Sequence, residues 1–507
     1  MSRINNATRN IKYGYVALIV QLVLGFISRT VFIYTLGVTF LGVNGLYTNV
    51  LGVLSLAELG FGTAMNYSLY KPIATGDYEK IKALMNLYKR AYRVIALVVS
   101  VIGLLLVPFL KYIIKDPGSI SIDELTIFYL IFLFNTASTY FVAYKYSLVN
   151  AEQKNYIQTN IHAITTLITV TVQIIILVVF KNFLMYLLTG AVIGLIQKIG
   201  VNIYLNRLYP YLLDKNVKDL SQEEKTPIKK NIIALIYCKI GEISVYQTDN
   251  IIISSFINIT TVGLISNYNL LITSVSGFIN IMFSSAISGF GNLIATENKE
   301  KQYFLFKVYR FLAFWMYGFA SIAFLNLLTP FIQLWIGKDM VVDSTVIYLI
   351  IIIYYINGHA IVVNNIRNAA GIFDATKYIA VIQAIVNLVV SIVMVKLIGL
   401  QGVFIGTICA TLVSTFTVPV IVYRSVFNKS PLEYYKDSIF YLLAMGVAIT
   451  SLELIKRKIF VENTIISFIT MMFFVTVIPN IVFYIFFRNR KEYHYILKLI
   501  KTKLHRR

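Results

Sequence analysis

Arginine is rare inside long apolar stretches, and this sequence has one at Arg29. Gln21, Gly25 and Arg29 are spaced four residues apart, so they share one face of a helix. A guanidinium can hold phosphate oxygens through two parallel hydrogen bonds. A charge within a membrane costs about 2.5 to 3.5 kcal/mol and usually faces a bundle interior or a watery cavity. We therefore predict that Arg29 binds phosphate in a cavity; in the alternative it reaches the outer surface or pairs with a carboxylate such as Glu58.

Acidic residues occupy another apolar stretch, where Glu242 and Asp249 fall seven residues apart on one helical face. Buried carboxylates can exchange protons near neutral pH. We predict that Glu242, Asp249 and Glu58 couple the protein to a gradient of H⁺ or Na⁺. The alternative is a structural ion pair with Lys239 or Arg29.

Polar side chains also recur at helical spacing in several other apolar stretches. Hydroxyls and amides in such stripes can line a path for sugar, or can bond one helix to another at about 0.6 kcal/mol per contact. The residues that we predict to line a sugar path are Gln21, Gln173, Asn269, Asn280 and Asn387.

Two further cations, Lys145 and Arg367, stand at the predicted inner ends of apolar stretches. We predict that they join Arg29 in binding phosphate. Ordinary anchoring at the membrane surface is the alternative explanation.

The composition is that of an integral membrane protein. Of 507 residues, 58% are hydrophobic and only 13% are charged, whereas soluble domains carry about a quarter charged residues. A spanning helix needs about 20 mostly apolar residues. Fourteen stretches meet this need: 14–36, 41–65, 95–114, 125–149, 161–180, 183–205, 232–256, 262–290, 312–334, 345–363, 379–397, 403–423, 439–454 and 465–487.

The net charge of +22 invites a nucleic-acid interpretation, but the placement of the 45 basic residues argues against it. If the N-terminus is cytoplasmic, most of them fall in inner loops, as the positive-inside rule requires. We therefore expect both termini in the cytoplasm, a basic tail lying against anionic lipid, and no nucleic-acid partner. The loops predicted outside carry only Lys111, Lys115, Lys181, Lys338, Lys396, Lys456, Arg457 and Lys458.

The sequence repeats itself after 221 residues, until one extra residue brings Pro108 onto Pro330. Membrane proteins built from two parallel repeats are commonly transporters. The loops 71–93 and 297–310 match across the repeat, and each is expected to form an amphipathic helix at the membrane surface. Repeat pairs include Asn10 and Asn231, Arg29 and Asn250, Gly42 and Gly263, Tyr47 and Tyr268, and Lys89 and Arg310.

The predicted organisation is all-α. Residues 1–206 form a six-helix bundle, 207–230 a cytoplasmic linker, and 231–428 a second six-helix bundle. Residues 429–487 add two helices that lack a repeat counterpart, and 488–507 form the basic tail. No P-loop pattern and no histidine pair with metal-ligand spacing is present in the sequence, so an ATP-driven pump and a metalloenzyme are disfavoured. We expect no cofactor.

Several segments in order carry a resemblance: Ser28-Arg29 at the end of the first span, 36–47, Glu58-Leu59-Gly60-Phe61-Gly62, and Ala74-Thr75-Gly76-Asp77. With the repeat and the fourteen spans, they resemble the polysaccharide-transporter (Wzx-type) branch of the multidrug/oligosaccharidyl-lipid/polysaccharide (MOP) exporter superfamily.

The resemblance implies two bundles around a central cavity, alternating access without ATP, and a bacterial cytoplasmic-membrane location. It also implies a substrate: an undecaprenyl-pyrophosphate-linked oligosaccharide, flipped from the inner to the outer leaflet for capsule, exopolysaccharide or O-antigen assembly. Partners would then include membrane lipids, a polysaccharide polymerase and assembly proteins.

Three alternatives stay open. A flippase for a peptidoglycan or teichoic-type precursor would move a lipid-linked substrate by nearly the same physical mechanism. A drug or cation antiporter usually manages with twelve spans and a more acidic cavity. A membrane polysaccharide polymerase would need a sizeable outer loop with catalytic residues, and the outer loops predicted here are short.

Overall fold

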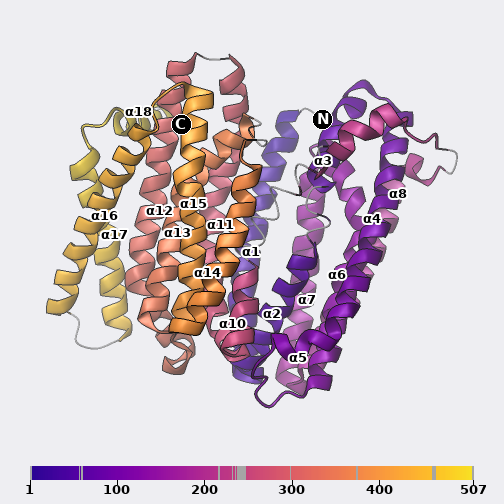
Figure 1. The fold of residues 1–507 in the computed structure, drawn as a ribbon, viewed down its shortest axis with the longest axis horizontal. Coiled ribbons are helices and arrows are strands. Elements are labelled where there is room, and N and C mark those ends of the chain that lie inside the picture. Colours follow the sequence, from indigo (N-terminus) through magenta and orange to yellow (C-terminus); the bar gives the residue numbers. More distant parts are fainter. Residues whose placement is uncertain are drawn as a thin grey trace. The chain divides into compact units, whose positions relative to one another are not determined.

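The computed structural model describes residues 3–55, 58, 61–214, 217–230, 232–233, 236, 247–296, 298–370, 372, 375–459 and 464–504. These residues form an all-helical protein (Figure 1). Its helices are α1 (Arg3–Leu36), α2 (Val38–Leu54), α3 (Phe61–Thr75), α4 (Tyr78–Leu106), α5 (Leu110–Ile113), α6 (Ile122–Ala151), α7 (Asn155–Phe180), α8 (Phe183–Leu208), α10 (Thr248–Phe256), α11 (Ile259–Thr296), α12 (Lys299–Ile336), α13 (Ser344–Ala369), α14 (Lys377–Ile398), α15 (Leu400–Val422), α16 (Leu432–Ile459), α17 (Ile465–Phe487) and α18 (Lys491–Leu504), with short turns η2 (Val107–Phe109), η3 (Pro210–Leu213), η4 (Lys338–Met340) and η5 (Tyr423–Phe427).

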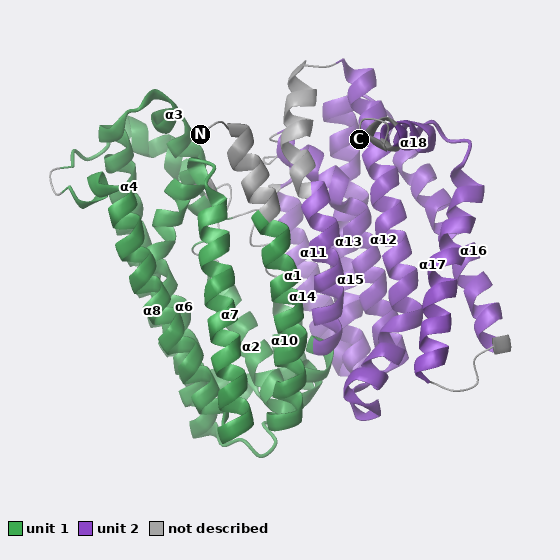
Figure 2. Ribbon diagram, turned by 180° about the vertical axis from the view of Figure 1, so that it is seen from behind, with its two compact units in different colours: residues 1–266 green, residues 267–507 purple. Residues whose placement is uncertain are grey.

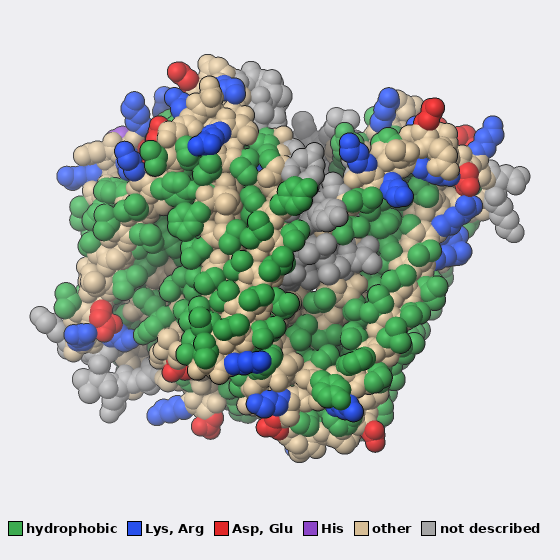
Figure 3. Space-filling model, viewed as in Figure 1, with side chains coloured by type: hydrophobic (Ala, Val, Ile, Leu, Met, Phe, Trp, Pro, Cys, Tyr) green, Lys and Arg blue, Asp and Glu red, His purple; other side chains and the backbone are tan. Residues whose placement is uncertain are grey.

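Twelve helices in the described part are long and apolar enough to cross a membrane. The predicted all-α membrane fold is thereby confirmed. Hydrophobic side chains cover the middle of the helices and charged ones gather toward their ends (Figure 3).

Two of the fourteen predicted spans are not among the twelve. The second is split: α2 has 17 residues, and tight turns from Ser55 to Glu58 and from Glu58 to Phe61, each closed by a 2.9 Å backbone hydrogen bond, separate it from α3. Most of the seventh predicted span, 232–256, lies outside the described residues, which include only α10 and a few positions before it.

The chain divides into two compact units, residues 1–266 and 267–507 (Figure 2). Residues 247–266, which the repeat assigns to the second half, therefore pack with the first unit.

Two glycines explain this packing within unit 1. A Cβ added to Gly42 of α2 would lie 2.0 Å from the carbonyl oxygen of Ile259, and one added to Gly263 of α11 would lie 2.2 Å from that of Val38. Each of these residues is the repeat partner of another in the set, and the repeat partners Thr39 and Thr260 share a hydrogen bond of 3.2 Å. The first turns of α11 thus cross α2 with local two-fold symmetry.

The repeat is also visible in helix capping. Asp77 accepts a hydrogen bond of 3.0 Å from the Lys80 N–H at the start of α4. Its repeat partner Asn298 accepts one of 2.9 Å from the Lys301 N–H at the start of α12. Side-chain oxygens at this position start helices because they satisfy free N–H groups of the first turn.

The segments 71–93 and 297–310 are expected from the sequence to form amphipathic helices at the membrane surface, and residues 78–93 and 299–310 are helical. They are not helices of their own, however. After each cap the charged residues form the first turns of one long helix, which continues directly into the apolar span. Neither segment contains a proline after its cap that could end the helix early.

The linker after α8 is tied to α4 by ion pairs. Lys80 contacts Glu224 at 2.7 Å, Lys82 contacts Asp214 at 3.0 Å, and Arg90 contacts Asp219 at 3.3 Å. The hydrogen bond from Lys80 lowers the pKa of the Glu224 carboxyl.

In unit 2, the helices without repeat counterparts pack on α12 through aromatic rings. Phe314 of α12 stacks on Tyr441 of α16 with ring centres 4.2 Å apart, and it contacts Phe483 of α17 at 4.9 Å. The basic tail forms α18, whose Glu492 pairs with Lys307 of α12 at 3.4 Å. The tail therefore docks on protein, in addition to any contact with lipid.

Candidate functional site

Arg29 lies half-buried on α1. Its guanidinium donates a hydrogen bond of 2.8 Å to the Ser266 hydroxyl, which in turn donates to the Gly263 carbonyl oxygen at 2.7 Å. No ion pair joins Arg29 to a carboxylate within the described part of unit 1. The guanidinium offers five N–H donors, so this arrangement can bind an anion.

An amide cluster lies where α10 packs on α2. The Asn49 side chain donates to the Gln247 side-chain oxygen, and Asn250 donates to the Asn49 side-chain oxygen at 2.8 Å. Asn250 is the repeat partner of Arg29. Asp249 is half-buried in the first turn of α10 beside this cluster. The predicted coupling residue Glu242, with Lys239, lies outside the described residues.

Glu58 faces tyrosine hydroxyls. Tyr92 of α4 donates to its carboxylate at 3.5 Å, and Tyr140 of α6 donates to the nearby Ser55 hydroxyl at 3.1 Å. Within the described residues Glu58 does not pair with Arg29, so its proposed role in coupling stays a prediction.

Lys145 lies at the base of a pocket of about 460 Å³ between α4, α6, α8 and η3. Only 3% of Lys145 is exposed. Its ammonium donates to the side-chain oxygens of Asn202 and Asn206, the latter at 2.5 Å. Lys198 lines the same pocket and donates to the Asn135 side chain at 2.8 Å and the Ser138 hydroxyl at 2.7 Å.

Arg367 has a different setting in unit 2. It is half-buried at the end of α13, and its guanidinium lies 3.2 Å from the side-chain oxygen of Asn368. Lys145 and Arg367 occupy roughly equivalent positions in the repeat, but their surroundings in the structure differ.

The predicted sugar-path residues fall into two groups. Gln173 is buried and donates to the Tyr186 carbonyl oxygen of α8 at 3.1 Å, and Asn387 is fully buried and donates to Thr407 of α15 at 3.1 Å. These are bonds between helices, the alternative stated for such stripes. Gln21, Asn269 and Asn280 are exposed, and Asn280 accepts a hydrogen bond of 2.6 Å from Tyr317.

The predicted site residues thus contact different helices. In unit 1, Arg29 contacts the start of α11, Glu58 contacts α4, and Lys145 contacts α8. The residues Arg367, Asn269, Asn280 and Asn387 belong to unit 2.

Sequence reasoning missed most of the pocket around Lys145. Its other cations are Lys89, Arg93 and Lys198, and Asn202 and Asn206 complete the base. One signal was available: Lys198, Asn202 and Asn206 are spaced four apart, which places three polar groups on one face of an apolar helix.

Comparison with known proteins places the fold. Neither a scan of family models nor a search of curated proteins found a match. Among solved structures, the lipid II flippase MurJ in an inward closed conformation superimposes with a TM-score of 0.67 at 14% identity, over 94% of this chain and 99% of that one. The chain has the same fold as this flippase.

Transporters of the multidrug MATE family share this fold. A MATE transporter from Vibrio cholerae matches with a TM-score of 0.59 at 15% identity, over 85% of this chain and 99% of its own. An inward-facing multidrug resistance MATE transporter of the MOP superfamily gives 0.58 at 15% identity, over 79% of this chain and 92% of that one.

Proposed function

We propose that this protein is a flippase that moves an undecaprenyl-pyrophosphate-linked oligosaccharide from the inner to the outer leaflet by alternating access. The observation that carries the proposal is the fold match with a lipid II flippase over 94% of this chain and 99% of that one. The MATE matches cover 79 to 85% of this chain.

The surroundings of Arg29 support a phosphate-bearing substrate. The guanidinium is half-buried on an apolar helix, and a neutral hydroxyl accepts its recorded hydrogen bond. Removal from bulk water strengthens the attraction between such a cation and a pyrophosphate. Planar bidentate geometry favours phosphate oxygens further.

Coupling to an ion gradient completes the proposed cycle. Asp249, beside the amide cluster of α2 and α10, and Glu58, among tyrosine hydroxyls, are the described carboxylates suited to bind H⁺ or Na⁺. Glu242 is the third candidate, on sequence grounds alone. The protein would work in a bacterial cytoplasmic membrane with both termini inside, next to the polymerase and assembly proteins that consume its product.

A flippase for a peptidoglycan or teichoic-type precursor is the second candidate, favoured by the same match to a lipid II flippase. Both candidates share a polyprenyl-linked headgroup. They differ in the sugar, which Arg29 does not discriminate.

The test is leaflet-resolved labelling of lipid-linked oligosaccharide in cells depleted of this protein. We expect the glycolipid to accumulate on the cytoplasmic side, wild-type protein to restore export, and Arg29→Ala to fail. Arg90→Ala, which removes an exposed guanidinium of the same chemistry, serves as the matched control and should restore export. Glycolipid that reaches the outer face without the protein would contradict the proposal.

A further inference from the structure

We propose that the pocket between α4, α6 and α8 binds the phosphate headgroup of an anionic membrane phospholipid. The sequence analysis predicts that Lys145 binds the substrate phosphate together with Arg29. We assign Lys145 instead to this second site, whose occupant would be a resident lipid of the bilayer. Charge, the chemistry of the pocket mouth, and the repeat each support the inference.

The pocket concentrates positive charge without a compensating carboxylate. Lys89, Arg93, Lys145 and Lys198 line it, and its described lining includes no Asp or Glu. The two deeper lysines are held by amide and hydroxyl oxygens, which fix the ammonium groups without neutralising them. Basic pockets between membrane helices are suited to anionic lipid headgroups.

The mouth of the pocket is apolar and exposed. Phe141, Leu195 and Ile199 line it with exposed fractions of 58%, 38% and 53%. Arg93 is followed directly on α4 by the exposed residues Val94, Leu97 and Val98. A ligand must therefore present an anion to the base and hydrocarbon to the rim, as a phospholipid does and a soluble phosphate does not.

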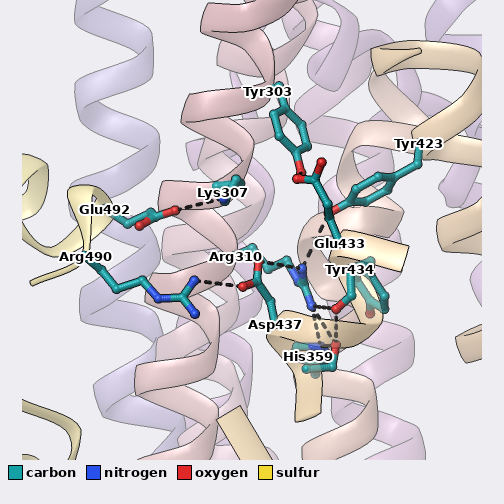
Figure 4. Close-up of polar contacts among 11 residues, drawn as sticks. Tyr303, Lys307, Arg310, His359, Tyr423, Glu433, Tyr434, Asp437, Arg490 and Glu492 are labelled. Carbon is teal, nitrogen blue, oxygen red and sulfur yellow. Dashed lines mark hydrogen bonds and ion pairs between the residues drawn. The ribbon is translucent and has the colours of Figure 1, made fainter. Parts of the chain in front are cut away.

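In the second half of the chain, the repeat partner of Lys89 has partners within the protein. Lys89 corresponds to Arg310 of α12, which is only 1% exposed. Arg310 donates to the Tyr434 carbonyl oxygen at 2.5 Å and to the Ser438 hydroxyl at 2.6 Å, and it lies 3.7 Å from the Asp437 carboxylate (Figure 4).

All three of these partners of Arg310 come from α16, which has no counterpart in the first half of the sequence. In unit 2, α16 therefore covers Arg310 and places the Asp437 carboxylate beside it. In unit 1 the equivalent cation lines an open pocket. Within a membrane, the nearest abundant anion at this position is a phospholipid phosphate.

The test measures lipid binding to the purified full-length protein by native mass spectrometry. The protein is titrated with phosphatidylglycerol or, in a parallel arm, with phosphatidylcholine of the same acyl chains. A third arm adds inorganic pyrophosphate as a competitor. The pocket variant Lys89→Gln/Arg93→Gln removes two of the four cations that line the pocket, and Lys71→Gln/Arg90→Gln removes the same charge from positions outside it.

We expect tighter binding of phosphatidylglycerol than of phosphatidylcholine, and a loss of about fivefold per cation removed, hence about 25-fold in the pocket variant. The control variant should bind as the wild type does. Equal binding of both lipids, or equal binding by the two variants, would overturn the proposal. Displacement by pyrophosphate at the lipid's own concentration would also overturn it, by identifying a site for free anions. The export assay above separates the two proposals, because it reports on Arg29 and not on this pocket.

Discussion

At the scale of single residues, the two most buried cations in the described part of the chain, Lys145 and Arg310, have different surroundings. Lys145 is held by neutral amide oxygens, whereas Arg310 is surrounded by Tyr434, His359 and Asp437. The guanidinium carbon of Arg310 lies 3.8 Å from the centre of the Tyr434 ring, a cation–π contact strengthened by burial. Arg310 therefore secures α16 to α12 in unit 2.

Replacing Arg310 tests this role. Asp437 would keep its ion pair with Arg490 at 2.7 Å. The main loss is that of the hydrogen bonds from the charged guanidinium to Tyr434 and Ser438, each worth about 1.5 to 3 kcal/mol. We expect Arg310→Met to lower the free energy of unfolding by a similar amount, seen as a lower thermal midpoint of the detergent-solubilised protein. The control is Arg457→Met, whose exposed pair with Glu453 at 3.4 Å should contribute about 0 to 1 kcal/mol. Equal midpoints for the two variants would refute the anchoring role.

The sequence did not reveal the burial of Arg310. The sequence predicts an amphipathic helix at the membrane surface for the charged segment 297–310, because local hydropathy depends only on neighbours in the chain. Tyr434, Asp437 and Ser438, which contact Arg310, lie more than a hundred positions later, on α16, and His359 lies 49 positions later, on α13. The pocket around Lys145 was not predicted from the sequence for the same reason, because most of its lining residues come from three helices, α4, α6 and α8. Arg29 was identifiable because a charge within a single apolar stretch is a local signal.

At the scale of elements, the crossing of α2 and α11 depends on glycine at Gly42 and Gly263. A methyl group at either position would approach a backbone carbonyl oxygen to about 2 Å, so the helices would have to separate. We expect Gly42→Ala and Gly263→Ala each to destabilise the protein by about 1 to 3 kcal/mol, as overpacking does.

Gly200→Ala is the matched control for the crossing, because an added Cβ at this helical glycine has no atom within 4 Å. It should leave the thermal midpoint unchanged or raise it, since alanine favours helix by about 1 kcal/mol over glycine. If Gly42→Ala unfolds at the same temperature as Gly200→Ala, the close crossing does not support the fold.

Most elements were predictable. Spanning helices follow from windows of about 20 apolar residues, and twelve of the fourteen predicted spans are found as helices in the described residues. The repeat placed Asp77 and Asn298 as equivalent positions, and both cap helices. The division of the second span at Glu58 was not foreseen, because its hydropathy alone does not reveal the turns around this residue.

At the scale of the whole molecule, the fold comparison finds the fold that the sequence resemblance implies, that of the flippase MurJ and of MATE transporters. They reach it by different routes, since the match to MurJ has only 14% sequence identity. The similarity to MurJ therefore lies in the arrangement of the helices.

The most direct measurement is flipping of a fluorescent undecaprenyl-pyrophosphate-linked oligosaccharide by the purified protein in proteoliposomes, read by quenching of the outer leaflet under an imposed H⁺ or Na⁺ gradient. We predict gradient-dependent movement that Arg29→Ala reduces at least tenfold, as loss of a charge-assisted phosphate contact of about 1.5 to 3 kcal/mol implies, while Arg90→Ala retains it. Absence of movement by wild-type protein under either gradient, or full activity in Arg29→Ala, would contradict the proposed flippase and its phosphate-binding arginine.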